Sequence, residues 1–566
     1  MKYGVFMTTQ SLFFKKFSKK SLALALPVCL PLFFGACSQP QNQAQTGDTA
    51  DKTSETKTDT TKSDRDTLVI NNGAEVGSLD PHKTGGVPES GLARQQFVGL
   101  VSTDADGNLE PAIAESWESA DNKVWTFKLR DAKWSNGEPI TAHDFVFSFQ
   151  RMVDPKTAAN FANYVADAKF LNANDIIEGK KSPTELGVKA IDDKTVEITL
   201  SEPVAFLPDM LTYTAMRPVP KNVVEKLGDN WSKIENIVVN GPYIIKERVM
   251  GEKIVLAKNP HYYDADKVAI PNLVLLPIDS GQTDYTRYQA GEIDVTYTDI
   301  PSDILAKADK NEVKTSPSFC SYYYEMNVNK PPFDDVRVRR AMTLTLDREL
   351  IAEKVAARGE TPAYQMTPKV TANNPNYTPD WQKLDKTARI AEAKKLLAEA
   401  GYNEQNPLKF ELLYNTSENH KKVAVAAQSL WQEALGDTIK IELHNQEWKS
   451  YLATRRNHEH QMARAAWCGD YNDPATFLNV MKTKGSGNYG AYSSAEYDNL
   501  LKTAYTANSP EERAKVYHEL EAILDKDVPN VWVYYQVNVR AVKPYVKGYS
   551  TKDALGNWQA RHWSFE

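Results

Sequence analysis

The chain has 566 residues and a formal net charge of −7 at pH 7, with 41% hydrophobic and 25% charged residues. At about 150 residues per domain it is long enough for roughly two to four domains. The acidic balance argues against a general nucleic-acid binder, which needs a basic face. Four cysteines in so long a chain exclude a disulfide-dense scaffold, and no apolar run beyond the first 36 residues reaches the length of about 18–20 residues that spans a bilayer.

The N-terminus has the pattern of a bacterial export signal. Lysines between Lys15 and Lys20 precede an apolar run at 21–34, and the small residues Gly35 and Ala36 come directly before Cys37. We therefore predict a signal peptide at 1–36. The segment FGAC resembles the lipobox of bacterial lipoproteins, which implies that Cys37 is lipidated; ordinary cleavage after Ala36 remains the alternative.

The segment after the signal differs sharply in composition. Residues 38–64 contain no apolar side chain larger than alanine, so they cannot bury enough surface to fold. We expect residues 37–65 to form a disordered tether between a lipid and a folded part that begins near Asp66. The predicted location is the periplasm or cell envelope, with a lipid anchor.

Export also bears on the cysteines. Cys29 leaves with the signal and Cys37 takes the lipid, so Cys320 and Cys468 remain in an oxidising compartment. We expect these two residues to form a disulfide; two buried free thiols remain the alternative.

The first half of the folded chain contains several predicted strands and a helix. Strands are expected at 68–72, 124–129, 196–200 and 254–257, because each is a short apolar or alternating run. The residues Thr141 to Asp144 open a helix that continues to Met152.

The region 387–467 alternates between helices and strands. Apolar residues at helical spacing from Ile390 to Ala400 end at Gly401, a typical C-cap. A strand at 408–413, a helix at 421–435 closed by Gly436, a strand at 439–443 and a further helical stretch lead to 463–467. This order predicts an α/β region with right-handed crossovers and a largely parallel sheet.

Near the C-terminus, Ser509 begins a capping box with Pro510 at the first helical position. The helix is expected to end near Asp525 and to precede a long strand at 531–539.

Motifs for catalysis and metal binding are mostly missing from the sequence. It contains no GxxxxGK[ST], HExxH, CxxC or GxSxG. The histidines His458 and His460 are better explained by a solvated loop than by a zinc site. The segment 485–490 matches G-x-G-x-x-G, but it does not follow a strand, so we interpret it as a loop. We therefore predict no enzyme, no metal and no cofactor, although a spatially assembled triad is not visible in a sequence.

One segment carries a specific resemblance. Residues 464–474 (RAAWCGDYNDP) closely resemble the segment R-A-G-W-C-A-D-Y-N-E-P of the periplasmic oligopeptide-binding proteins, the receptors of ABC peptide importers. The resemblance extends over about 66–566 and includes the segments 79–83, 114–117, 144–146, 241–243, 291–294, 320–325, 332–337 and 414–417.

The resemblance implies a two-lobed clamp of the periplasmic-binding-protein type, type II-like, with an extra domain of mixed α+β structure. The first lobe would comprise 66–97, 221–319 and 538–566, and the accessory domain 98–220. The second lobe would be 320–537. The family's disulfide falls on Cys320 and Cys468.

The resemblance also implies roles for individual residues. Asp470 matches the family's acid for the peptide amine. The peptide backbone would pair with Gly85, Gly86, Val87, Ala466 and Cys468. Candidates for the peptide carboxylate are Arg455, Arg464 and His420. Side-chain pockets would be lined by Trp448, Trp467, Tyr323 and Phe161.

At several positions this chain departs from the family's enteric type. Ala356 replaces a site lysine and Gly85 a site glutamate, and pocket tyrosines become Phe161, Ser318 and Gln536. The preferred peptide length and the tolerance for side chains are therefore expected to differ.

The predicted function is that of a monomeric, lipid-tethered receptor. It would bind short peptides in extended form and deliver them to an ABC permease in the inner membrane, served by separate ATPase subunits. The alternatives are a relative with another ligand (a dipeptide, murein tripeptide or other small solute), an exported peptidase, and a surface adhesin.

Overall fold

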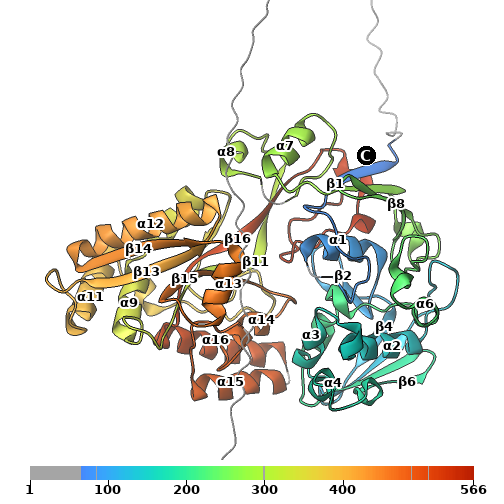
Figure 1. Ribbon diagram of the computed structural model, residues 1–566, viewed down its shortest axis with the longest axis horizontal. Coiled ribbons are helices and arrows are strands. Elements are labelled where there is room, and N and C mark those ends of the chain that lie inside the picture. Colours follow the sequence, from blue (N-terminus) through green and yellow to red (C-terminus); the bar gives the residue numbers. More distant parts are fainter. Residues whose placement is uncertain (1–64, 85, 298–299, 486, 508) are drawn as a thin grey trace, which may run out of the picture. The chain divides into compact units, whose positions relative to one another are not determined.

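The computed structural model describes residues 65–84, 86–297, 300–485, 487–507 and 509–566. These residues belong to one compact unit, which spans Lys62–Glu566 (Figure 1). The predicted signal peptide at 1–36, the lipidation at Cys37 and nearly all of the tether at 37–65 lie outside the described residues. Among the described residues, no helix combines the length and apolar character needed to cross a membrane.

The first sheet has the strand order β1-β10-β9-β8. β1 runs parallel to β10, and the other pairs are antiparallel. Its elements fall within the predicted first lobe, whose boundaries stay a prediction. The strands are β1 (Thr67–Asn71), β8 (Tyr243–Val249), β9 (Lys253–Lys258) and β10 (Asn272–Leu276), and the helices beside them are α1 (Val87–Gln96), α6 (Lys221–Leu227), α7 (Gly281–Gln289) and α8 (Ser302–Leu305).

The second sheet is antiparallel, with the order β4-β5-β7-β6, and lies within 98–220. Helix α2 (Ala142–Val153) packs against β6 and β7. The predicted start of this helix is confirmed, because Thr141 and Asp144 form a reciprocal capping box. The remaining elements here are β2 (Val101–Thr103), β3 (Leu109–Pro111), β4 (Ala114–Glu118), β5 (Val124–Leu129), β6 (Val188–Asp192), β7 (Thr195–Thr199), α3 (Ala162–Asp167), α4 (Ala173–Ile177) and α5 (Leu207–Met210).

The third sheet has the order β12-β16-β11-β15-β13-β14. Its strands are β11 (Val313–Met326), β12 (Thr361–Pro362), β13 (Leu408–Asn415), β14 (Ile439–Gln446), β15 (Met462–Cys468) and β16 (Asn530–Ala541). The prediction of a largely parallel sheet is only half right. β13 is parallel to β14 and β15, whereas β11 is antiparallel to both β15 and β16.

The helices of this region include all those that the sequence predicted. Helix α12 begins after Ser417, whose hydroxyl accepts a hydrogen bond from the backbone N–H of His420, and ends at Gly436 with φ +63°. The helices are α9 (Val336–Thr345), α10 (Arg348–Leu350), α11 (Lys386–Glu399), α12 (Glu418–Leu435), α13 (Trp448–Arg456), α14 (Ala475–Leu478), α15 (Ala495–Thr506) and α16 (Pro510–Asp527).

The strands β11 and β16 link the first and third sheets. They pair along most of their length, side by side in Figure 1. At the far end of β16, Ala541 and Val542 pair with Thr296 and Val295, and Val295 also bridges to Ile70 of β1. The only covalent crosslink in the described residues is the predicted disulfide between Cys320 and Cys468, which is confirmed.

Candidate ligand-binding site

Strand β15 has one open edge. Along one side it pairs with β11 from Met462 to Cys468. On the other side β13 pairs with Met462 and Ala463 only. In the described residues, no further strand covers that edge beyond Ala463. The carbonyl of Arg464 accepts a hydrogen bond from the Tyr451 hydroxyl, and the backbone groups beyond it are open to pairing with an extended ligand.

The register of β15 decides which residues face the open edge. Directly opposed residues in antiparallel strands alternate between hydrogen-bonded pairs with Cα atoms about 5.5 Å apart and non-bonded pairs about 4.5 Å apart. The Cα atoms of Cys320 and Cys468 are 4.0 Å apart, so this pair is of the non-bonded kind. By alternation, the N–H and C=O groups of Ala466 and Cys468 point away from β11, toward the open edge.

A cavity of about 400 Å³ lies at the end of β15, and we call it the Asp470 cavity. Residues from α3 and α5 form one part of its wall, and residues from the segment 467–485, together with Gly487 and Tyr505, form the other. Trp467 lines this cavity, as the sequence predicted for a pocket residue, and its buried indole N–H has no hydrogen-bond partner among the described residues.

Asp470 has an unusual electrostatic environment. Its backbone N–H donates to the hydroxyl of Thr476 at 3.0 Å, whereas its carboxylate has no hydrogen bond or ion pair within the described part of the chain. Burial, with a smaller contribution from the negative charge of Asp167, raises the pKa of Asp470 to about 6. The group is therefore an acid without a counter-ion, facing a cavity.

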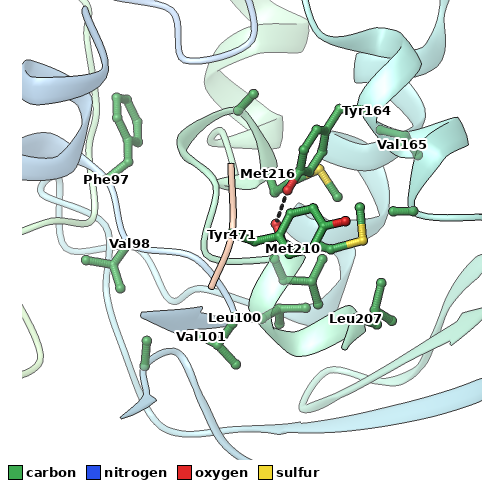
Figure 2. Close-up of a cluster of buried hydrophobic side chains, with 14 of the residues drawn as sticks. Phe97, Val98, Leu100, Val101, Tyr164, Val165, Leu207, Met210, Met216 and Tyr471 are labelled. Atoms are coloured by element: carbon green, nitrogen blue, oxygen red, sulfur yellow. Dashed lines mark hydrogen bonds between the residues drawn. The ribbon is translucent and has the colours of Figure 1, made fainter. Parts of the chain in front are cut away.

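The next residue fixes the position of Asp470. Tyr471 is 4% exposed, and Figure 2 shows it among Tyr164, Leu207 and Met210, which belong to the helices beside the second sheet. Its ring also stacks on Phe206, with centroids 5.5 Å apart and an interplanar angle of 9°. The Asp470 cavity is thus enclosed by packing between the predicted accessory domain and the predicted second lobe.

A second cavity of about 830 Å³ lies near the other end of β15, and we call it the Arg464 cavity. It is lined by the residues Ile300, Pro301, Ser302, Asp303, Tyr322, Ala356, Arg358, Ser417, Glu418, Asn419, His420, Lys422, Arg464, Tyr534 and Gln536. Two of the predicted carboxylate-binding residues, Arg464 and His420, therefore face one cavity.

Arg464 is a buried cation without an acidic partner. It is 9% exposed, and its guanidinium lies 4.7 Å from the centre of the Tyr322 ring. One Nη donates a long hydrogen bond of 3.4 Å to Asn415, while Nε has no partner among the described residues. Burial, together with the charges of Arg464 and Arg358, lowers the pKa of His420 to about 3, so His420 is neutral at physiological pH.

Other predicted site residues lie elsewhere. Arg455 is buried in an ion pair with Glu325, at 3.1 Å, and His460 lies 3.3 Å from the same carboxylate. Arg455 lines neither of the two cavities. Tyr323 is 1% exposed and packs edge-on against Trp532.

Three more predicted site residues, Gly86, Val87 and Phe161, line neither cavity. Gly86 is the N-cap of α1, and Val87, the first residue of that helix, is exposed. Phe161 precedes α3 and packs edge-on against Tyr213. Gly85 and the side chain of Trp448 lie outside what the structure describes. The roles of all these residues stay predictions.

Sequence reasoning missed the other charged residues that line the two cavities, and two of these, Asp167 and Arg358, act electrostatically on predicted site residues. Asp167 faces the Asp470 cavity from the end of α3, and Arg358 faces the Arg464 cavity from the loop after Ala356. Neither belongs to a motif, and no local pattern distinguishes them from surface charges. Within the described ranges, no group of three or more His, Cys, Asp or Glu side chains is arranged to hold a metal.

Comparison with known proteins identifies the family. Residues 108–489 match the family model of bacterial extracellular solute-binding proteins, family 5 (Middle). The periplasmic oligopeptide-binding protein OppA of Salmonella typhimurium is 49% identical over 498 residues, which cover 87% of this chain and 91% of that protein.

Solved structures of similar proteins support the same family assignment. The Haemophilus influenzae OppA complex with RPPGFSPFR is 45% identical, with a TM-score of 0.75 over 89% of this chain and 100% of that one. The Escherichia coli murein tripeptide binding protein MppA is 40% identical, with a TM-score of 0.76 over 89% and 99%. The predicted type II-like solute-binding fold is confirmed by these neighbours. This chain therefore belongs to the bacterial extracellular solute-binding proteins of family 5.

Proposed function

We propose that this protein is the substrate-binding receptor of an ABC importer and that it binds short peptides in extended form. One observation carries the proposal. An acid without a counter-ion, Asp470, and a buried cation without an acidic partner, Arg464, lie near the two ends of one open strand edge. This arrangement complements a zwitterionic peptide, which offers an ammonium group, a carboxylate, and backbone groups between them.

Each part of the ligand has a partner in this proposal. The carboxylate of Asp470 binds the ammonium group, and enclosure within the cavity strengthens that interaction relative to water. The backbone groups of Ala466 and Cys468 pair with the peptide main chain, which gives affinity without sequence preference. Arg464 binds the C-terminal carboxylate through its planar fork of donors, with neutral His420 beside it.

Named relatives favour a peptide over other solutes. The similar proteins include oligopeptide-binding, murein peptide-binding and dipeptide-binding proteins, and also a probable deoxycholate-binding protein of Escherichia coli at 41% identity. A bile acid has a carboxylate but no ammonium group, so it leaves Asp470 without a partner. Among the alternatives, a murein peptide remains the nearest competitor because it shares both charged groups.

The proposal extends to the location and partners of the protein. A lipid on Cys37 would hold the receptor at the cell envelope, and a monomer would deliver peptides to an inner-membrane permease with separate ATPase subunits. We propose a receptor without catalytic activity. Incubation of purified protein with peptides tests that point, since appearance of cleavage products contradicts it.

The ligand itself can be identified directly. Mass spectrometry of molecules released by denaturing the purified protein is expected to find a ladder of short peptides of mixed sequence with free termini. A single non-peptide solute, or one unique peptide, contradicts the proposed function.

A further inference from the structure

Arg358 is placed in the Arg464 cavity by the backbone around it. The helical turn Ile351–Ala356 ends at Ala357, which has φ +55°, and Gly359 has φ +115°. These two residues lie in the left-handed region, so the chain turns sharply on both sides of Arg358. Arg358 therefore lines the cavity from a tight loop, not from a helix.

Glu360 fixes the orientation of Arg358. Its carboxylate, which is fully buried, accepts a hydrogen bond from the backbone N–H of Arg358 at 2.7 Å and another from Nε at 3.0 Å. The two terminal nitrogens of the guanidinium have no partner among the described residues. The pair therefore leaves a fork of donors free on a side chain that is only 20% exposed.

Two guanidinium groups with free donors face the cavity, and the acids that line it pair with neither of them. Arg464 has no acidic partner, and Arg358 uses only Nε and its backbone in binding Glu360. Both guanidinium groups act on His420, which stays neutral. Glu418 and Asp303 also line the cavity, but both are exposed to water and form no hydrogen bond or ion pair with either arginine among the described residues.

One peptide carboxylate satisfies one of these two arginines. The C-terminal carboxylate is assigned to Arg464 in the proposed function, and this inference rests on that assignment. The fork of Arg358 then remains available for a second anion, and an arginine fork binds a carboxylate in a bidentate manner. A peptide whose last residue is aspartate or glutamate carries both carboxylates at the same end.

We infer that Arg358 makes this receptor selective for peptides with an acidic C-terminal residue, the terminal carboxylate binding Arg464 and the side-chain carboxylate binding Arg358. Glu360 is the positioning residue that holds the fork. The selectivity is a difference in affinity between peptides of the same length that differ only in the charge of the last side chain. It adds to the main-chain recognition and does not replace it.

Isothermal titration with two matched tetrapeptides tests the inference. One ends in glutamate and the other in glutamine, and their first three residues are identical. The wild-type protein is expected to bind the glutamate peptide about tenfold more tightly, as for a partly buried charge-assisted pair. Arg358→Gln is expected to abolish the preference, and Arg358→Lys to keep part of it.

Two further variants test whether a lost preference reflects misfolding or a general change of charge. Arg358→Gln leaves Glu360 buried and unpaired, so the double variant Arg358→Gln with Glu360→Gln removes both charges and keeps hydrogen-bonding side chains. It is expected to lack the preference while binding both peptides. Lys421→Gln removes an exposed cation on α12 that does not line the cavity, and it is expected to keep the preference.

The outcomes separate this inference from the proposed function. Equal affinity of the wild type for the two peptides, or a preference that survives Arg358→Gln and the double variant, overturns the selectivity and leaves peptide binding intact. Failure of the wild type to bind either peptide overturns the proposed function itself.

Discussion

Arg464 and Asp470 are six residues apart on β15 and its continuation, yet they open into two different cavities. Arg464 is a buried cation without an acidic partner, and Asp470 is an acid without a counter-ion. β15 carries Arg464 and ends at Cys468, two residues before Asp470. β geometry therefore sets most of the distance between the two charges, and the packing of Tyr471 on Phe206 sets the rest.

This spacing predicts a preferred ligand length. Six fully extended residues span about 20 Å at about 3.3 Å each, and this is an upper bound because the strand ends at Cys468, before Asp470. In a series of alanine peptides, affinity is expected to rise steeply from two residues and to be highest at about four or five. Calorimetry across the series checks this expectation. A dipeptide that binds as tightly as the tetrapeptide contradicts it, because a dipeptide cannot reach both charges.

Affinity is also expected to depend on pH. The pKa of Asp470 is raised to about 6, so the carboxyl group is ionised above that pH and protonated, hence unable to neutralise an ammonium group, below it. The peptide amine loses its proton near pH 8. Affinity should therefore be highest between about pH 6 and 8 and fall by up to tenfold per pH unit on the acid side.

The predicted fall of affinity at acid pH has a matched control. Asp209, whose pKa is raised to about 7 by burial and by Asp473, titrates in the same range. The variant Asp470→Asn retains that group but removes the proposed one. Affinities measured from pH 4.5 to 8 should fall at acid pH in the wild type but not in the variant. An identical fall in both proteins assigns it to another group.

Closure around the ligand is expected to depend on Phe206. Its ring is 1% exposed and packs against Tyr471 and Tyr505, which come from the other side of the Asp470 cavity. Phe206→Ala should lower affinity at least about tenfold through faster dissociation, since a large buried ring contributes several kcal/mol of packing, of which only part is specific to the closed state. Stopped-flow dissociation rates measure this effect. The loss should be equal for peptides with free and acetylated amines, and a loss confined to free amines contradicts a packing role.

The disulfide is expected to stabilise the fold. It closes a loop with a sequence separation of 148 residues, which corresponds to roughly 4–5 kcal/mol in the chain-entropy description. A double Cys320→Ser, Cys468→Ser variant should unfold at clearly lower urea concentration than the oxidised protein. The reduced wild type is the control and should unfold like the variant. Equal midpoints for oxidised and reduced protein contradict a stabilising role.

Much of the local structure is readable from the sequence because local rules determine it. Ser417, Gly436 and the capping box at Thr141 mark helix ends through contacts within a few residues. Strand β11 has no such signal. Residues 318–326 are buried without a break, so the strand lacks the alternation that identifies a half-buried strand.

The site is only partly readable for the same reason. Asp470 and Arg464 belong to one recognisable segment, whereas the open edge of β15 depends on where β13 stops pairing. The neutralisation of Arg455 depends on Glu325, which is 130 residues away. Arg358 faces the cavity because of a loop conformation that no sequence motif predicts. Such non-local relationships appear only in the folded chain.

The central claim is that the carboxylate of Asp470 binds the free amino end of the ligand. It is tested most directly by calorimetry of wild type and Asp470→Asn with one peptide in free and N-acetylated form. For the wild type, acetylation should weaken binding at least about 30-fold, equivalent to 2 kcal/mol or more. In Asp470→Asn the free peptide should bind about as weakly as the acetylated one. An acetylation penalty of the same size in both proteins would contradict the account.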